Sequence, residues 1–397
     1  MTVENPLARD EARVAFYNDP KIRSIFYQVA LCAVVALLVY SAISNMIENL
    51  QRAKIASGFG FWNQIAGFDI SQTLIEYSSS VSTYGRAFWV GLLNTLLIAG
   101  LGVVFSTILG FTIGIARLSK NWLIARLAEG YVEIIRNIPL LLQLLFWYNA
   151  VLKALPDLRD SPALWGGGYI NNRGLFLPEP IFKAGFGAVW IALLIGVVGA
   201  IGFRVWARRR QESTGQQAPV LWVTLGLVIG LPLVVFAAAG MPLEWSFPEK
   251  GRFNIRGGVE VVPEFVALLV GLVAYTAGFI AEVVRAGIRA VPHGQTEAAG
   301  SLGLRSGQAL RLIVIPQAMR VIIPPLTSQY LNLTKNSTLA VAIGYPDLVQ
   351  IFTGTVLNQT GQAVEVVAIT MAVYLTISLV TSFVMNVYNS RMALKER

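Results

Sequence analysis

The sequence predicts an all-α integral membrane protein with about eight transmembrane helices. Its 397 residues are 55% hydrophobic and only 13% charged, whereas soluble domains carry about 25% charged residues. The apolar residues form continuous runs of about 20, which is the length that a helix needs to cross roughly 30 Å of hydrocarbon. The runs lack the polar and apolar alternation of a barrel strand, so the spanning elements are expected to be helices.

Eight apolar runs define the predicted spans and the domain organisation. The runs cover residues 26–47, 87–116, 131–151, 186–205, 220–239, 263–286, 312–331 and 364–388. Pro and Gly punctuate residues 156–183 and 241–262, which are therefore expected to be loops. The predicted parts are a tail, first span and external segment (1–86), a first core part (87–151), an insertion with two extra spans (152–262), a second core part (263–390) and a cytoplasmic tail (391–397).

Positive charge determines the expected orientation. Arg204 and the arginines at 208–210 close the fourth run, and such clusters stay on the cytoplasmic side of a membrane. Counting spans from there places both termini in the cytoplasm. The first residues are polar and the following run is too long for a signal peptide, which predicts a retained anchor. The net charge of +9 is therefore explained by the cytoplasmic ends of the membrane helices. The sequence contains no stripe of basic residues interleaved with aromatic ones, so nucleic-acid binding is not predicted.

The sequence predicts neither a catalytic nor a metal site in this chain. Cys32 is the sole cysteine, so an intrachain disulfide is excluded. His293 is the sole histidine, and a metal site would need other soft ligands beside it. No G-x-x-x-x-G-K-[ST] phosphate loop occurs, so any ATP used must be bound by another polypeptide. No cofactor is expected in this chain.

The loop at residues 291–318 is the most informative segment outside the spans. Pro292 and Gly294 are expected to stop the preceding helix, and Thr296 is expected to cap a new short one. Glu297 then lies in the first turn of that helix, where a carboxylate suits the helix dipole. The predicted result is a short helix against the membrane, presented to the cytoplasm.

The rest of this loop predicts a smooth helix face and a defined helix end. Ala298 and Ala299 are expected to leave a low surface that a partner backbone can approach closely. Gly303 is expected to end the helix in the left-handed conformation. Ser306 is expected to start the next helix, which enters the membrane and is weakened or kinked at Pro316.

The loop resembles the EAA signature of bacterial ABC import permeases, whose pattern is E-A-A, three residues, G, nine residues, I-x-L-P. The matching residues are Glu297, Ala298, Ala299, Gly303, Ile313 and Pro316. The only departure is Ile315 in place of the usual Leu. In that family the short helix docks into a groove on the ATPase subunit. The alternative is an ordinary connecting helix, which needs no such spacing.

Four other segments resemble the polar amino acid uptake branch of this family. They are residues 91–96 (GLLNTL), 131–143 (YVEIIRNIPLLLQ), 274–287 (AYTA through Glu282 to RAG) and 335–339 (KNSTL). They lie in the two core parts of the chain. The two extra spans between those parts resemble the longer permeases of general L-amino acid systems.

The resemblance implies a type I ABC importer permease of the bacterial inner membrane that translocates amino acids by alternating access. ATP hydrolysis would then take place in a partner chain. The implied partners are a homodimeric ABC ATPase, a second related permease or a second copy of this chain, a periplasmic amino-acid-binding protein and membrane lipid.

Two charged pairs lie in the core spans at helical spacing. Glu133 and Arg136 are three residues apart, and Glu282 and Arg285 repeat that spacing, so each pair can meet on one helix face. Ionisable groups in membrane helices are functional candidates, because a zwitterionic amino acid needs an anion and a cation facing it. A structural pair that holds helices together is an equal alternative.

Other polar groups lie in or beside the apolar runs. They are Asn94, Thr95, Gln143, Asn332, Lys335 and Asn336. Such side chains either bond helix to helix or line a path, and both interpretations stay open. Pro324 and Pro325 are expected to break the seventh span, which would place a gate near them.

Two other classes of protein are alternatives to an ABC permease. An ion- or proton-coupled secondary amino acid transporter would need carboxylates deep in the spans, and the sequence supplies few. A membrane scaffold without transport would leave the spaced motif of the 291–318 loop unexplained.

Overall fold

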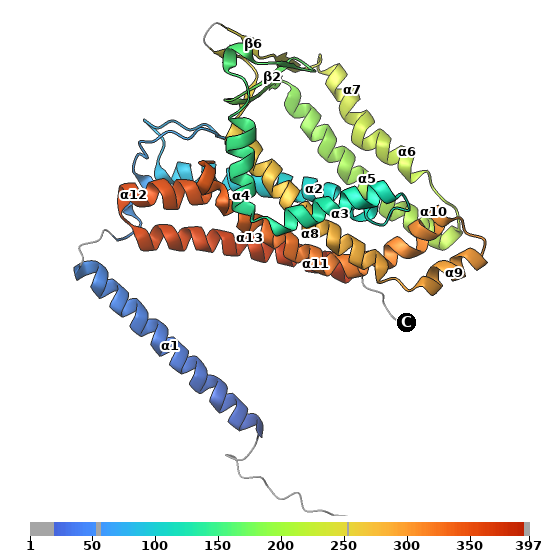
Figure 1. The fold of residues 1–397 in the computed structure, drawn as a ribbon, viewed down its shortest axis with the longest axis horizontal. Helices are drawn as coiled ribbons and strands as arrows, with labels where there is room; N and C mark the ends of the chain where they lie inside the picture. Colours follow the sequence, from blue (N-terminus) through green and yellow to red (C-terminus); the bar gives the residue numbers. More distant parts are fainter. Residues whose placement is uncertain (1–19, 53–56, 252–253, 393–397) are drawn as a thin grey trace, which may run out of the picture.

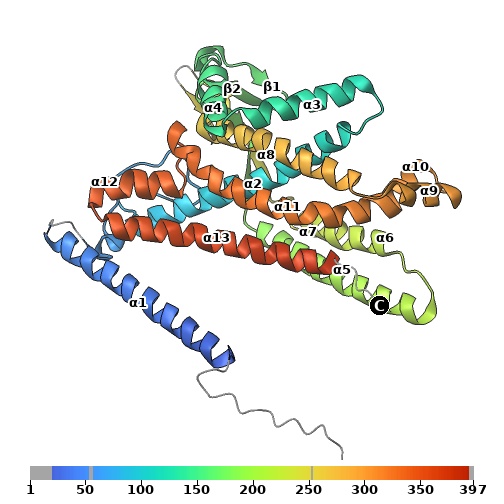
Figure 2. The same cartoon turned by 60° about the horizontal axis from the view of Figure 1, so that its bottom comes forward.

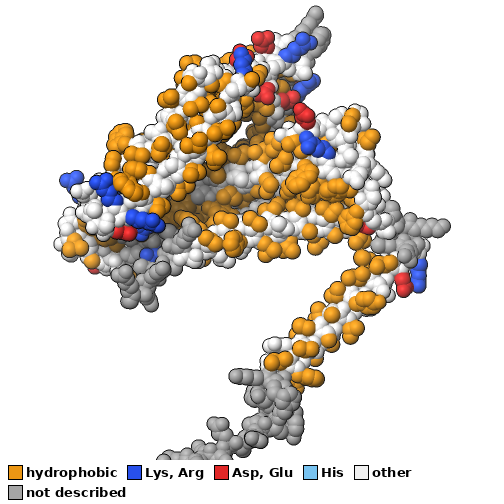
Figure 3. Space-filling view, turned by 180° about the vertical axis from the view of Figure 1, so that it is seen from behind, with side chains coloured by type: hydrophobic (Ala, Val, Ile, Leu, Met, Phe, Trp, Pro, Cys, Tyr) orange, Lys and Arg blue, Asp and Glu red, His pale blue; other side chains and the backbone are white. Residues whose placement is uncertain are grey.

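The structure is a computed structural model that describes residues 20–52, 57–251 and 254–392. Long helices form a bundle with a small layer of short strands beside it (Figures 1 and 2). In this described part, seven helices are long and apolar enough to cross a membrane, or up to eight if a bent pair is one span. Apolar side chains cover the helices and charged ones gather towards the ends (Figure 3). The predicted all-α membrane fold is confirmed.

Helices α2 (Tyr84–Ala116) and α8 (Pro263–Arg289) form the centre of the bundle. A Cβ atom added to Gly110 would lie 2.6 Å from Ile280, and one added to Gly114 would lie 2.8 Å from the Ala281 carbonyl oxygen. Both distances are shorter than van der Waals contact. Small residues of this kind let membrane helices approach closely, so the two glycines determine how near α2 and α8 lie.

Helices α11 (Ile315–Asn336) and α13 (Ala363–Met392) complete the core. A Cβ atom on Gly287 of α8 would lie 2.3 Å from the Ile322 side chain of α11. Buried apolar residues of both helices pack together there, and they are Ile280, Val284, Ala318, Ile322 and Leu326. Helices α8 and α11 therefore pack without a gap between them.

The predicted break at Pro324 and Pro325 is wrong, because α11 continues through both prolines. Proline fixes φ near the helical value, and the packed neighbours of α11 hold the rest of the helix in place. The backbone is irregular earlier, where a π-helical segment, η6 (Leu310–Val314), precedes Pro316. The helix continues from η6 into α11, so Pro316 lies within it, and the π-helical segment directly before this proline is where the regular hydrogen-bond pattern is interrupted.

The prediction of one continuous span at 131–151 is also wrong. The chain there forms α3 (Trp122–Asn137), then α4 (Leu140–Leu145), which continues into the π-helical η3 (Phe146–Leu152). The two helical parts meet at 105°. The cause is local, since the residue before a proline avoids the helical region, and Ile138 before Pro139 is extended with ψ 127°.

Gln143 satisfies the backbone groups that this bend releases. Its side-chain amide donates to the carbonyl oxygens of Ile135 at 2.8 Å and Ile138 at 2.9 Å. Buried carbonyl groups without partners would be costly in hydrocarbon, so these bonds stabilise the bend. The side chain of Gln143 is itself almost completely buried.

The predicted pair of extra spans forms a helical hairpin. Its elements are α5 (Phe186–Thr214), α6 (Val220–Leu225), the π-helical η5 (Gly226–Gly230) and α7 (Leu231–Ala238). The two arms cross closely, since a Cβ atom on Gly196 would lie 2.1 Å from the Leu227 carbonyl oxygen. At the N-terminal end of the chain, α1 (Pro20–Arg52) is a single apolar helix that lies apart from the bundle (Figures 1 and 2).

The two predicted loops at 156–183 and 241–262 are partly wrong, because they contain strands that pair with each other. The elements are η4 (Leu158–Asp160), β1 (Ala163–Leu164), β2 (Gly168–Asn171), β3 (Gly174–Leu177), β4 (Glu179–Phe182), β5 (Leu243–Ser246), β6 (Glu249–Lys250), β7 (Ile255–Arg256) and β8 (Val259–Val261). The largest sheet is antiparallel with the order β1-β2-β3-β8. Phe176 of β3 pairs with Glu260 of β8, although 84 positions separate them in the sequence. The helical hairpin of α5 to α7 lies between these two strands along the chain.

The end of the bundle opposite to α9 (His293–Ser301) is closed by short helical pieces and by residues 57–83. The pieces are η2 (Gly60–Asn63), η7 (Ser337–Ile343), η8 (Gln350–Val356) and α12 (Leu357–Thr360). Phe61 is buried there against Tyr84 and Phe352. The aromatic residues of the first external segment therefore form a small core of their own.

The crossing of α2 and α8 gives a direct test. We expect Gly114→Ala to lower the free energy of unfolding by about 1–3 kcal/mol, because the new methyl group overlaps the α8 backbone. Gly100→Ala on the same helix is the matched control, since nothing lies within 4 Å of its added Cβ. Thermal unfolding in detergent measures both variants. Equal melting temperatures for the two would contradict the packing argument.

Candidate functional site

The site predicted from the sequence is the short helix α9 with its flanks. It extends from His293 to Ser301 after Pro292, and α10 (Ser306–Ala309) follows it. The predicted cap at Thr296 is wrong, because the helix starts three residues earlier, with Pro292 at the N-cap and no side-chain capping bond. Pro292 has φ −58° and ψ 137°, which is not helical, so the helix begins at the next residue. Glu297 therefore lies in the second turn.

Gly303 ends α9 as predicted. Its φ of +76° is left-handed, which favours glycine. The Leu304 N–H donates to the Ala299 carbonyl at 3.1 Å, and the Gly303 N–H donates to the Gly300 carbonyl at 2.9 Å. This is the Schellman pattern of helix ends. The chain can then turn sharply into α10, which begins at Ser306 as predicted.

The predicted smooth face of Ala298 and Ala299 is wrong. Successive residues of a helix point about 100° apart, so two neighbours rarely share one face. Ala299 is completely buried against its own chain, whereas Ala298 is exposed. Ala299 thus anchors α9, and the surface presented outward carries Ala298, Glu297 and Leu302 instead.

Two features of this surface were missed by the sequence analysis. The side chain of Leu302 is 80% exposed at the end of α9. The Glu297 carboxylate lies 3.0 Å from His293 Nδ1, one helical turn away. Their spacing of four residues could have predicted this pair. The remaining motif residues follow in η6 and α11, where Ile313 is half-buried and Pro316 is exposed.

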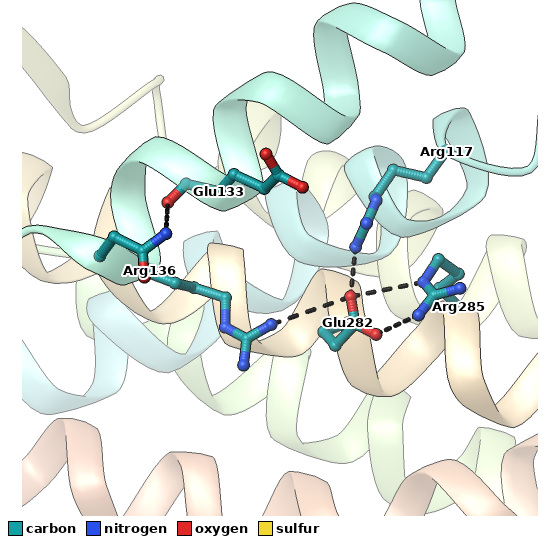
Figure 4. Close-up of polar contacts among 6 residues, drawn as sticks. Arg117, Glu133, Arg136, Glu282 and Arg285 are labelled. Carbon is teal, nitrogen blue, oxygen red and sulfur yellow. Dashed lines mark hydrogen bonds and ion pairs between the residues drawn. The ribbon is translucent and has the colours of Figure 1, made fainter.

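A second cluster of charged residues lies where α2, α3 and α8 meet (Figure 4). Arg117 and Arg285 both donate hydrogen bonds to the Glu282 carboxylate. A third guanidinium, that of Arg136, lies 3.9 Å from the same carboxylate. Sequence spacing predicted the contact with Arg285, but Arg117 is far away in the sequence and only the helix crossing reveals it.

The predicted pair of Glu133 and Arg136 does not form. Arg136 points to Glu282 and lies over the Phe279 ring at 5.1 Å, whereas the Glu133 carboxylate is exposed and points elsewhere (Figure 4). Among the ion pairs that the described residues make, none includes Glu133. The Glu282 carboxylate is shared by three cations, which supports a structural role for this cluster.

The remaining polar candidates do not converge on one site. Asn94 is buried and donates to the carbonyl oxygens of Gln72 and Pro346, both at 2.9 Å. Thr95 accepts from the Leu348 N–H at 3.0 Å. Lys335 is exposed at the end of α11. Asn94 and Thr95 therefore connect α2 to the chain around η8, in the same way that Gln143 holds the bend after α3.

Asp347 was missed by the sequence analysis, although it interrupts an apolar segment. It is completely buried between η7 and η8. Its carboxylate accepts from the Gln350 N–H at 2.8 Å and from the Tyr374 hydroxyl at 3.2 Å. Burial raises the pKa of Asp347 to about 7. This carboxyl group is therefore protonated more readily than a carboxyl group in water.

These features define a class of protein: a multi-pass helical membrane protein with a short exposed helix between two core spans. The family described as "Binding-protein-dependent transport system inner membrane component" matches residues 213–394.

Curated relatives cover nearly the whole chain. The general L-amino acid transport system permease protein AapQ of Rhizobium johnstonii is 54% identical over 97% of this chain and 96% of its own length. The glutamate/glutamine/aspartate/asparagine transport system permease protein BztB of Rhodobacter capsulatus is 41% identical over 98% of this chain and 100% of its own length. A crystal structure of an amino acid ABC transporter with histidines aligns with a TM-score of 0.46, at 22% identity over 78% of this chain and 95% of that one.

The chain therefore belongs to the family of binding-protein-dependent ABC transporter permeases, the inner membrane components of these systems. The family that the EAA motif predicted is confirmed, and so is its amino acid uptake branch.

The Glu282 cluster predicts an asymmetry between two carboxylates. Glu282→Gln should lower the free energy of unfolding by about 2–3 kcal/mol, because three guanidinium groups then lose their shared counter-charge at a partly exposed site. Glu133→Gln, on an exposed side chain, is the control and should change it by less than about 0.5 kcal/mol. Thermal unfolding in detergent distinguishes them. A similar change for both would contradict the structural role.

Asp347 predicts a pH dependence of stability. Its folded pKa lies above the ordinary aspartate value, so the folded state holds a proton that the unfolded state releases. The contribution of Asp347 to the free energy of unfolding is fully present below about pH 4. It is lost as the pH rises from there through about 7, which lowers the free energy of unfolding by up to about 4 kcal/mol. Asp347→Asn should flatten that decline between pH 5 and pH 8, as measured by chemical unfolding in detergent.

Asp69→Asn, on an exposed loop residue, is the control for this measurement and should leave the decline unchanged. The same decline in the Asp347→Asn protein as in the unaltered chain would show that Asp347 is not its source.

Proposed function

We propose that this chain is the membrane-spanning permease subunit of an ABC importer for amino acids and that α9 couples it to a separate ATPase. The observation that carries the coupling is the position of α9. It is joined directly to α8 at one end and, through α10 and η6, to α11 at the other. A force on α9 therefore acts on two central helices at once.

The packing around α9 supports this coupling. Ala299 buries the inner face of the helix, and Gln317 of α11 donates to the side chain of Gln295 at 3.2 Å. In the adjoining parts of α8 and α11, Gly287 packs against Ile322 without space for an extra methyl group. Because packed helices move as units, motion of α9 would shift α8 and α11 together. It would not be absorbed by bending of the connections between α9 and these helices.

The outward surface of α9 suits a protein partner. Leu302 supplies an exposed apolar contact at one end, and His293 with Glu297 supplies a polar one at the other. Interfaces combine apolar contacts with polar ones in this way. We propose that the partner is the ATPase dimer, which binds and hydrolyses ATP outside this chain.

The orientation and the other partners follow from this proposal. The α9 end would face the cytoplasm, together with both termini and the arginines at the end of α5. The opposite end, closed by residues 57–83 and the strand layer, would receive an amino acid from a periplasmic binding protein. A second related permease or a second copy would complete the pathway. The printed names of the relatives, which transport general L-amino acids or glutamate, glutamine, aspartate and asparagine, support amino acids as the substrate class.

We favour a structural role for the Glu282 cluster over contact with a zwitterionic substrate. Both carboxylate oxygens already accept from guanidinium groups, so little capacity is left for the ammonium group of an amino acid. The bonds of Asn94 and Gln143 to backbone carbonyls argue in the same direction.

The class of function is tested by uptake into proteoliposomes that contain the chain, its ATPase, its permease partner and the binding protein. We expect amino acid uptake that requires both internal ATP and the binding protein. Uptake driven by an ion gradient without the ATPase would contradict the proposal and favour a secondary transporter.

Gly303 tests the coupling helix in the same assay. Gly303→Val forces a β-branched residue to adopt φ +76°, which costs about 1–3 kcal/mol and should displace the end of α9. We expect ATP-driven uptake to fall roughly tenfold while the ATPase continues to hydrolyse ATP. Gly307→Ala, with nothing within 4 Å of its added Cβ, is the matched control. Coupled uptake at the normal rate in Gly303→Val would contradict the role of α9.

A further inference from the structure

A polar cavity of about 440 Å³ lies beside the Glu282 cluster, between the turn from α2 to α3 and the end of α8. Arg289, at the end of α8, also lines a neighbouring pocket beside His293 and Thr296 of α9. Five cations and one carboxylate are among the residues that line it, namely Arg117, Lys120, Arg126, Arg285, Arg289 and Glu129. The cavity therefore concentrates positive charge at one end of the molecule.

The internal ion pairs compensate only part of this charge. Arg117 and Arg285 share the single carboxylate of Glu282, and Arg126 pairs with Glu129 at 2.6 Å. Lys120 and Arg289 are exposed, and no ion pair within the described ranges includes either one. Cations gathered around one cavity raise its potential and favour an anion within it.

The cations are also held in place before any ligand arrives. The Arg117 side chain is only 10% exposed, because it lies between helices and donates to Glu282. The same carboxylate fixes Arg285 from the neighbouring turn of α8, with Nε at 3.3 Å. Guanidinium groups fixed in this way match the oxygen geometry of phosphate groups, and little ordering cost would remain on binding.

The start of α3 adds to the positive potential. This helix of 16 residues begins at Trp122, and both Trp122 and Ala125 line the cavity. The Asn121 side chain accepts from the Leu123 and Ile124 N–H groups, and the helix dipole adds partial positive charge at this end. The cavity thus lies at a helix N-terminus and is lined by both fixed and exposed cations.

The rim of the cavity is apolar and exposed. Trp122 lines the cavity at the start of α3 and is 72% exposed. Tryptophan next to basic residues at the end of a span is typical of the boundary between lipid head groups and acyl chains. A soluble phosphate would use only the cations, whereas a lipid would use the cations and the rim.

We propose that this cavity binds the phosphate group of an anionic phospholipid, with the acyl chains against Trp122. Binding there connects the turn after α2 to the end of α8 at the point where both enter the head-group layer. Basic pockets between membrane helices are suited to such head groups. The proposal does not depend on what the protein transports.

The test is a titration of the delipidated full-length chain, in an uncharged detergent, with phosphatidylglycerol and with phosphatidylcholine of the same acyl chains. Native mass spectrometry measures the bound lipid. We expect phosphatidylglycerol to bind at least tenfold more tightly, and Lys120→Ala with Arg289→Ala to weaken it roughly 10- to 30-fold.

The matched control is Arg204→Ala with Arg209→Ala, which removes the same charge from exposed positions of α5, whose C-terminal part lies towards the same end (Figures 1 and 2). It should leave phosphatidylglycerol binding unchanged. An equal loss in both double variants would overturn the proposal in favour of non-specific charge attraction. Displacement of the lipid by an equal concentration of inorganic phosphate would overturn the lipid as the ligand.

A folding defect is excluded by a second variant and a second measurement. Lys120→Gln with Arg289→Gln keeps the polar side chains and should weaken phosphatidylglycerol as the alanine variant does. In the unaltered chain, raising the salt concentration should reduce the preference for phosphatidylglycerol over phosphatidylcholine, because salt screens exposed cations. A preference that is independent of salt would contradict the role of Lys120 and Arg289.

Discussion

The close crossing of α2 and α8 is the constraint on which the rest of the structure depends. Gly110 and Gly114 bring the α2 backbone into contact with α8, and this contact places Arg117 beside Glu282. The apolar packing and the ion pair support each other. Packing brings the charges together, and the paired charges avoid the cost of unpaired ones at the end of a membrane helix. The nearby basic cavity exists because the same crossing gathers arginines from two helices.

The two ends of the bundle differ in whether their polar groups are exposed or buried. At the α9 end, exposed charges and the exposed Leu302 surround a short helix that is held by a buried alanine. At the other end, buried Asp347 and Asn94 bond to backbone groups beneath an aromatic cover formed by residues 57–83. The first end is suited to contact with a partner and the second to a closed and ordered surface.

Irregular backbone lies next to both of these regions. The π-helical segment η6 follows α9 and α10, and η8 follows Asp347. Single π-helical turns inside helices are frequent at functional sites, because they leave backbone groups that can exchange partners. Helices α8 and α11 are regular and tightly packed between these segments. A motion of α9 would therefore be transmitted by rigid helices, with the irregular segments as places where the backbone can adjust.

The sequence by itself determined the membrane class, the approximate spans, the family and the glycine that ends α9, because each depends on local composition or on spacing along the chain. Only the tertiary structure decided which partner each polar side chain has. Glu282 contacts Arg117, 165 residues away, and Glu133 forms no ion pair with Arg136 although their spacing allows one. It also showed the bend at Ile138, the unbroken path of α11 through two prolines and the pairing of strands across the inserted hairpin. These features depend on which helices cross and how closely, and helix crossing is a property of packed surfaces that no local pattern contains.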